Sequence, residues 1–197
     1  MQKKGNGYTT VEIVFMALIG VAFGVLFAFA GALWQFLNSA LGPLGSGVLA
    51  FFMVPQALAV FVIRKPGVYF VATMINMTSQ LLAGNPAGVA CLAWGVVGGA
   101  GGEFVYWAFK YRRWDLTSML LGPAAAILVN FPVSYYFFGW GSVPPIINIS
   151  STIINMLATG IESGWVAMAL AKALHRAGLL GPYRISESYA PEQETAR

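Results

Sequence analysis

Polar side chains that could bind a ligand recur at helical intervals inside stretches that carry almost no charge. One set follows spacings of three and four residues, which places its members on one face of a helix: Asn148, Ser151, Asn155, Thr159 and Glu162. Amides both donate and accept hydrogen bonds, and a carboxylate can offset a positive charge. This face would suit a polar, hydrogen-bonding ring, with Glu162 as the counter-charge if that ring is cationic.

Further amides and aromatic rings extend the pattern to other helices. We predict ten ligand-binding residues: Trp34, Gln56, Asn76, Gln80, Trp94, Asn130, Tyr135, Asn148, Asn155 and Glu162. The rings would stack on a flat ligand, with a further gain if it is cationic. An ordinary structural explanation stays open for each, because amides join helices in membranes and aromatic residues gather at membrane interfaces.

Other kinds of chemistry lack the residues that they need. The chain has one cysteine, Cys91, and one histidine, so we predict neither a disulfide nor a metal site. It contains no nucleotide-binding P-loop motif and no HExxH metalloprotease motif. We interpret Glu103, a second carboxylate within an apolar stretch, as a partner of Lys110 or of the basic loop that follows it. We therefore expect no enzymatic activity and no cofactor.

The elements that must position these residues are membrane-spanning helices. The chain of 197 residues is 58% hydrophobic and 9% charged, against about 25% charge in a typical soluble domain. No charged residue occurs in 13–63, 66–102 or 116–161. Each Lys or Arg at the centre of a membrane helix costs about 2.5–3.5 kcal/mol, so these stretches indicate burial in a lipid bilayer. Nothing in the basic clusters indicates a nucleic acid partner.

Clusters of Gly and Pro divide each uncharged stretch into two helices, since about 20 residues cross the hydrocarbon. We predict an all-α, single compact bundle of six transmembrane helices within a domain of residues 12–177. It is preceded by a cytoplasmic segment, 1–11, and followed by a polar cytoplasmic tail, 178–197, that we expect to be mobile from residue 181. The predicted helices span 12–34, 46–63, 66–83, 87–109, 116–138 and 146–172.

The basic residues predict an orientation for this bundle. They lie at the N-terminus, in the second and fourth connections and at the C-terminus, while the first, third and fifth connections carry no charge. The positive-inside rule then places both termini in the cytoplasm. On the first helix, small residues recur in a pattern that lets another helix approach closely.

Three segments resemble the S components of energy-coupling factor (ECF) vitamin transporters, and among them the YkoE family. They are residues 12–21 (EIVFMALIGV), 76–86 (with Asn76, then QLLAGNP from Gln80) and 98–103 (GGAGGE). S components are the substrate-binding subunits of this type of ABC importer, and the YkoE family serves thiamine or its hydroxymethylpyrimidine precursor. The resemblance implies a bacterial cytoplasmic membrane protein with a high-affinity cavity open to the outside, formed by the first, third and fifth connections and the last three helices.

The resemblance also implies partners. These are a transmembrane coupling protein, called the T component, and ATP-binding cassette ATPases that hydrolyse ATP. Small residues of the first helix, either Ala17 with Val21 or Gly20 with Gly24, would contact the coupling protein. The residues alone leave two other hypotheses open: a channel or secondary transporter that works by itself, and a scaffold whose polar residues only join helices.

Overall fold

A computed structural model describes residues 7–137 and 140–185, and all regular structure in those residues is helical. In chain order the elements are α1 (Thr10–Leu41), η1 (Gly42–Gly47), η2 (Phe51–Met53), α2 (Val54–Ile63), α3 (Val68–Leu82), α4 (Ala90–Ala108), α5 (Leu116–Val129), α6 (Phe131–Phe137), η3 (Trp140–Ser142) and α7 (Pro145–Arg176), where η marks a short 3-10 helix. The predicted all-α class is therefore confirmed. The predicted segments before residue 7 and after residue 185 lie outside the described residues.

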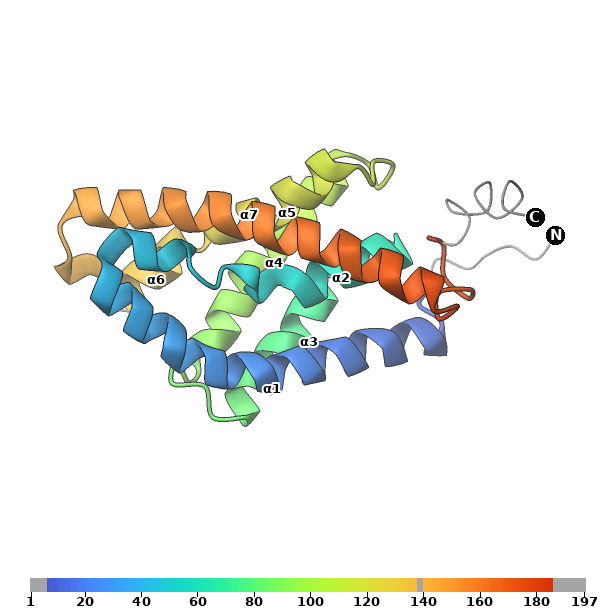
Figure 1. Ribbon diagram of the computed structural model, residues 1–197, viewed down its shortest axis with the longest axis horizontal. Coiled ribbons are helices and arrows are strands. Elements are labelled where there is room, and N and C mark those ends of the chain that lie inside the picture. Colours follow the sequence, from blue (N-terminus) through green and yellow to red (C-terminus); the bar gives the residue numbers. More distant parts are fainter. Residues whose placement is uncertain (1–6, 138–139, 186–197) are drawn as a thin grey trace.

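The two longest helices, α1 and α7, run along the length of the molecule, and the start of α1 lies at the same end as the end of α7 (Figure 1). A capping box begins α1: the Thr9 amide donates to the Glu12 carboxylate at 2.7 Å, and the Glu12 amide donates to the Thr9 hydroxyl at 3.3 Å. The helix ends at Gly42, whose φ of +58° suits a residue without a Cβ.

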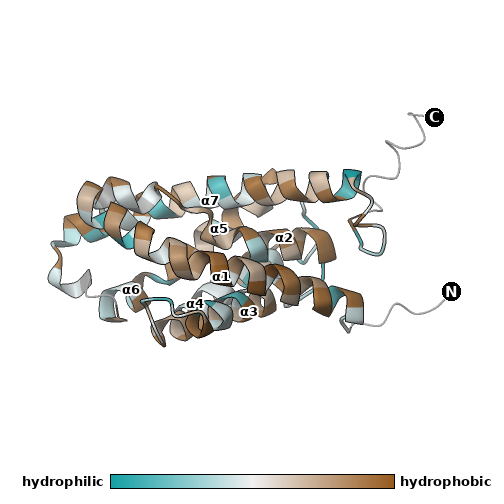
Figure 2. Cartoon of the chain, turned by 60° about the horizontal axis from the view of Figure 1, so that its bottom comes forward, coloured by the Kyte–Doolittle hydropathy of each residue, from teal (hydrophilic) through white to brown (hydrophobic). Residues whose placement is uncertain are grey.

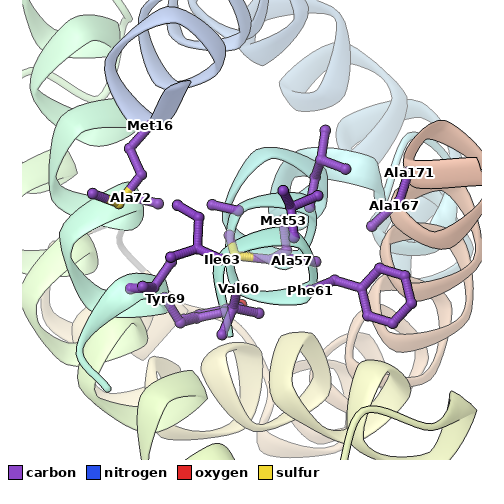
Figure 3. Packing of buried hydrophobic residues seen from close by; sticks show 14 of the residues in the cluster. Met16, Met53, Ala57, Val60, Phe61, Ile63, Tyr69, Ala72, Ala167 and Ala171 are labelled. Atoms are coloured by element: carbon purple, nitrogen blue, oxygen red, sulfur yellow. The ribbon is translucent and has the colours of Figure 1, made fainter. Parts of the chain in front are cut away.

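The short helix α2 lies at the centre of the core. All ten of its residues are buried, which explains why its sequence, apart from Gln56, is apolar on every side and not on one stripe. Figure 3 shows its side chains meeting Met16 of α1, Tyr69 and Ala72 of α3, and Ala167 and Ala171 of α7. Helices α1, α3, α5 and α7 therefore pack around α2 and separate it from the surroundings.

The second predicted helix, 46–63, is wrong in its first half. The chain there forms η1 and η2, separated by Leu49 in a left-handed conformation with φ +67°. The α-helix starts only at Val54 and has 10 residues, about 15 Å of length at 1.5 Å per residue. The irregular 42–53 segment packs on α1 and α7, and it forms part of the cavity described below.

Helices occupy all six predicted positions, but they differ in length. Within the described residues, three helical stretches are long and apolar enough to cross a membrane: Thr10–Leu41 (α1), Leu116–Phe137 (α5 with α6) and Pro145–Arg176 (α7). Large apolar side chains such as Leu18 and Phe29 are 65% and 73% exposed on α1, and apolar colour covers most of that helix (Figure 2). Such a surface belongs in lipid. The count of six crossings and the cytoplasmic position of both termini stay predictions.

Glycines let two pairs of helices approach closely. On α1, a Cβ at Gly20 would lie 2.7 Å from Ile75 Cγ2, and one at Gly24 would lie 2.9 Å from the Asn76 carbonyl oxygen of α3. On α7, Gly160 and Gly164 pack in the same way on the backbone of α5. Pro123 lacks the N–H that would bond to the Met119 carbonyl, and that carbonyl lies directly against Gly164.

Most charged residues gather at the end of the molecule where α1 starts and α7 ends, which we call the basic end. The Lys65 ammonium contacts the Glu12 carboxylate at 2.6 Å and the Gly7 carbonyl at 3.0 Å, and the Lys65 and Glu12 side chains are only 9% and 7% exposed. The pair joins the start of α1 to the turn between α2 and α3. The opposite end, where the connections after α1, α3 and α6 carry no charge, is called the neutral end.

Glu103 bonds to the basic loop after α4, as predicted, although through Tyr111 and not Lys110, and it also caps a helix. Its carboxylate accepts from the amides of Gly67, at 2.6 Å, and Phe70, at 3.2 Å, which are the first free N–H groups of α3. A negative group is stabilised at that position by the helix dipole. The Tyr111 hydroxyl donates to the same carboxylate at 2.7 Å, so Glu103 also attaches the connection between α4 and α5.

The first part of the predicted tail is packed. Leu180 and Ile185 are 1% and 0% exposed, the Tyr183 ring lies 5.1 Å from Phe15, and its hydroxyl donates to the Val11 carbonyl at 3.4 Å. The expected mobility is therefore wrong for residues 181–185, because these side chains cover the core at the basic end.

The contact between α5 and α7 makes Gly164→Ala a test of this packing. The added Cβ would lie 2.6 Å from the Met119 carbonyl oxygen, and overpacking of this kind costs about 1–3 kcal/mol. We expect the apparent melting temperature of the detergent-purified protein to fall by about 3–10 °C. Gly181→Ala, where the Cβ meets nothing within 4 Å, is the control. Equal melting temperatures for the two variants would contradict the close approach.

Candidate functional site

A cavity of about 150 Å³ opens among the helices toward the neutral end. Its walls come from the second half of α1, from η2, α3, the connection after α3, α4, α5 and α6, and from the first half of α7. The lining residues are Gly31, Trp34, Gln35, Phe52, Met77, Gln80, Asn85, Ala87, Cys91, Trp94, Ile127, Phe131, Ser134, Thr152, Asn155 and Thr159. None of these lining residues is charged at neutral pH. The arrangement combines aromatic walls with amide and hydroxyl groups, and it provides contacts for a flat polar molecule.

The aromatic walls are held from behind by the protein. Phe52 of η2 packs on Phe27 of α1 with ring centroids 4.9 Å apart, and Phe27 is fully buried. The backbone of α4 is held at Trp94, whose main-chain carbonyl accepts from the Asn130 amide at 3.2 Å. The Asn130 amide fits there because it lies against Gly98, where a Cβ would clash with it. The irregular 42–53 segment and the glycines of α4 therefore serve to place aromatic rings in the cavity.

Three amides form a continuous chain of hydrogen bonds, which we call the amide relay: Asn76, Gln80 and Asn85. Asn76 Nδ2 donates to the Gly20 carbonyl of α1 at 3.2 Å, and Gln80 Nε2 donates to Asn76 Oδ1 at 2.8 Å. Asn85 Nδ2 donates to Gln80 Oε1 at 2.8 Å, and the Ala87 amide donates to Asn85 Oδ1 at 2.9 Å. The relay runs from α1 through α3 to the next connection, and Gln80 and Asn85 line the cavity.

The polar stripe predicted on the last helix faces inward. Asn148, Ser151 and Thr159 are 4%, 5% and 1% exposed, as expected for polar groups on a membrane helix. Asn155 and Thr159 both line the cavity, and the Thr159 hydroxyl donates to Asn155 Oδ1 at 2.8 Å. This bond orients the Asn155 amide so that its nitrogen is directed away from Thr159.

Of the ten predicted ligand-binding residues, the structure brings four together in the cavity wall: Trp34, Gln80, Trp94 and Asn155. The other six lie outside the lining: Gln56, Asn76, Asn130, Tyr135, Asn148 and Glu162. Asn76 and Asn130 stand directly behind lining residues through the bonds given above. The Gln56 amide donates to η2, at the Phe52 carbonyl and Met53 Sδ. The Asn148 amide donates to the Val143 carbonyl at 3.2 Å, and Tyr135 packs against Phe131 and Tyr136.

Glu162 holds the irregular segment between α1 and α2. Its carboxylate accepts from the Ala50 amide at 3.0 Å, while the hydroxyl of the adjacent Ser163 donates to the Ala50 carbonyl at 3.1 Å. Both polar atoms of the Ala50 backbone are thus bonded to α7. Ala50 directly follows Leu49, which has a left-handed conformation, and lies two residues before Phe52. This geometry makes Glu162 an anchor for the segment that carries Phe52.

Sequence reasoning left out several lining residues. Gln35 directly follows Trp34, and Asn85 lies inside the segment that carries the family resemblance. Their closeness in the sequence to predicted residues is the feature that could have identified them as lining residues. Phe52, Met77, Cys91 and Phe131 give no such signal, because apolar side chains in a membrane helix look the same whether they face lipid, core or cavity.

The sequence matches a family of transport proteins. The model of the family described as ABC-type cobalt transport system, permease component, matches residues 11–129, more than half of the chain. The chain belongs to this family of permease components. It is also similar to a protein of Bacillus subtilis (strain 168) named as an HMP/thiamine permease, YkoE, with 23% identity over 186 residues that cover 94% of each chain.

The fold matches a solved permease subunit. A crystal structure of an S-component of ECF transporter superposes with a TM-score of 0.89, covering 96% of this chain and 97% of that chain at 22% identity. The permease described here therefore has the S-component fold, and the resemblance predicted from its sequence is confirmed. With its exposed apolar helices, it is a multi-pass membrane protein.

The position of Glu162 in this permease predicts how its substitution affects binding. Because the carboxylate contacts Ala50 and does not line the cavity, Glu162→Gln should not distinguish a cationic ligand from a neutral one. With thiamine as the cationic probe and hydroxymethylpyrimidine as the neutral probe, the two affinities should change by the same factor, within about threefold. Glu162→Leu, which removes both oxygens, should weaken both ligands by about tenfold, the worth of one hydrogen bond to a charged group. Isothermal titration of both variants with both ligands measures this. A loss confined to thiamine would instead make Glu162 the ligand's counter-charge.

Proposed function

We propose that this permease is the substrate-binding S component of an ECF-type importer in a bacterial cytoplasmic membrane, and that its cavity binds the pyrimidine ring of thiamine or of hydroxymethylpyrimidine. The observation that carries the proposal is an uncharged cavity, walled by two tryptophans and lined by four side-chain amides, within an S-component fold. The similarity to the protein named as an HMP/thiamine permease supports the choice of ligand.

The lining residues favour an organic ring over a metal ion. The described residues contain no group of three or more His, Cys, Asp or Glu side chains that could hold a metal, and Cys91 is the one lining residue of that kind. Divalent cobalt would be bound by such nitrogen, sulfur or carboxylate donors. Trp34 and Trp94 offer instead two flat faces for stacking, and Gln80, Asn85 and Asn155 offer both donors and acceptors to the edge of a ring.

Because no described lining residue is charged, the cavity wall offers no counter-charge to a cationic ligand. Hydroxymethylpyrimidine is neutral and needs no counter-charge. Thiamine carries one fixed positive charge on its second ring, which a tryptophan face attracts by about 0.5–2 kcal/mol. Both ligands share the aminopyrimidine ring, so the proposal assigns recognition to that ring and leaves the positive charge of thiamine to the aromatic walls.

Transport requires partners, because this chain carries no nucleotide-binding motif. We propose a T component and ATP-binding cassette ATPases as those partners, in line with the S-component fold and the ABC-type permease family. On α1, Gly20 and Gly24 are already occupied by α3 within the chain. Ala17, half-buried, and Val21, 48% exposed, are the pair that stays accessible to a coupling protein.

Binding is tested by titrating the purified protein with hydroxymethylpyrimidine and with thiamine while following tryptophan fluorescence. We expect saturable quenching, and we expect Trp94→Leu to weaken binding by about tenfold to a hundredfold, since stacking on an aromatic side chain contributes about 1–3 kcal/mol. The control is Trp165→Leu, because Trp165 is 64% exposed and outside the lining.

Transport is tested with the same protein in liposomes. The chain alone should take up no ligand, and uptake should require the T component, the ATPases and ATP. Uptake by the chain alone without ATP would contradict the proposal and support a self-sufficient transporter. No saturable binding of either ligand would contradict the assigned substrate.

A further inference from the structure

The amide relay has a direction that is set at both of its ends by the backbone. At one end the Gly20 carbonyl can only accept a hydrogen bond, and at the other end the Ala87 amide can only donate one. Each amide between them therefore places its nitrogen toward α1 and its oxygen toward the connection after α3. Turning any one amide around would set oxygen against oxygen or N–H against N–H at its contacts.

This direction decides what the cavity offers to a ligand. Gln80 Nε2 is used inside the protein, by Asn76 Oδ1 at 2.8 Å and by Met77 Sδ at 3.5 Å. Among the described bonds, Gln80 Oε1 accepts one hydrogen bond and Asn85 Nδ2 donates one, so each has capacity for one more. Because both residues line the cavity, the pair presents an acceptor beside a donor.

The structure assigns to Asn76 the role of a positioning residue that sets the ligand specificity of Gln80. This inference rests on the proposed function. Asn76 is fully buried and does not line the cavity, so it acts through Gln80 and touches no ligand. By accepting from Gln80 Nε2, it keeps the Gln80 oxygen available as an acceptor, which matches the amino group of an aminopyrimidine. The adjacent ring nitrogen of that ligand then accepts from Asn85.

A matched pair of ligands measures this role. One is hydroxymethylpyrimidine, whose amino group donates; the other is the same molecule with a methoxy group in place of the amino group, which can only accept. In the wild-type protein the methoxy oxygen would face the Gln80 oxygen, so we expect about hundredfold or stronger preference for the amino ligand. The ratio of the two dissociation constants reports which end of the Gln80 amide faces the cavity.

Two substitutions at one position separate orientation from packing. Asn76→Leu removes one of the three bonds that hold the Gln80 amide, so the preference for the amino ligand should fall by about tenfold. Asn76→Asp keeps an oxygen that accepts from Gln80 Nε2, and the preference should stay within about threefold of wild type. Thr73→Val is the control, because Thr73 is equally buried on α3 and bonds only to the Tyr69 carbonyl of its own helix. Asn76→Ala replaces Asn76→Leu if the leucine variant does not fold.

The outcomes distinguish this inference from the proposed function. In one outcome the wild-type protein prefers the amino ligand, but neither Asn76→Leu nor Asn76→Ala changes the ratio of the two dissociation constants. Asn76 is then only structural, even if both ligands bind more weakly to the variants. This outcome overturns the inference and leaves the proposed function standing. If the wild-type protein binds neither ring, the proposed function is overturned together with the inference. A ratio that falls in Asn76→Leu and is preserved in Asn76→Asp supports both.

Discussion

Inside a bilayer a polar atom finds no water, so it must be bonded within the protein, and this requirement organises the molecule. The carboxylates of Glu103 and Glu162 each accept backbone N–H groups where the regular helix pattern is interrupted. Glu12 and Lys65 meet each other at the basic end. The side-chain nitrogens of Asn76, Gln80 and Asn130 donate to backbone carbonyls or to another amide. Among the described residues, three buried oxygens are exceptions without a hydrogen-bond partner: Gln56 Oε1, the Tyr69 hydroxyl and Asn130 Oδ1. Polar side chains therefore mainly connect helices and loops to one another through hydrogen bonds, and some of them also line the cavity.

The same requirement explains how so small a chain can hold a cavity. Helix α2 is short and buried on all sides, which leaves room at the neutral end for the irregular 42–53 segment. That backbone is bonded to α7 through Ala50 and carries Phe52 into the cavity wall. Glycines in α1 and α4 bring the backbone or side chains of neighbouring helices close enough to form the relay and to place Trp94. The cavity thus depends on close helix packing as much as on its lining residues.

The sequence predicts much of the fold, because charges cannot enter lipid and Gly and Pro interrupt helices. It fails for residues 46–53, since an apolar run reads the same as a helix or as a buried irregular segment. It also fails to separate lining from supporting residues: Gln80 and Asn76 share one helix face, yet only Gln80 lines the cavity. For Glu162 the sequence leaves two roles open, the charge partner of a ligand or a buried hydrogen-bonding group, because its contact with Ala50 depends on a long-range approach that no spacing reveals.

The central claim is that this cavity holds a pyrimidine, and mass spectrometry of the small molecules carried through purification tests it most directly. Protein purified from cells that make or import thiamine should release hydroxymethylpyrimidine or thiamine in about one-to-one amount, and Trp94→Leu should release at least tenfold less. Release of a molecule without a pyrimidine ring, or equal release from wild type and Trp94→Leu, would contradict the account.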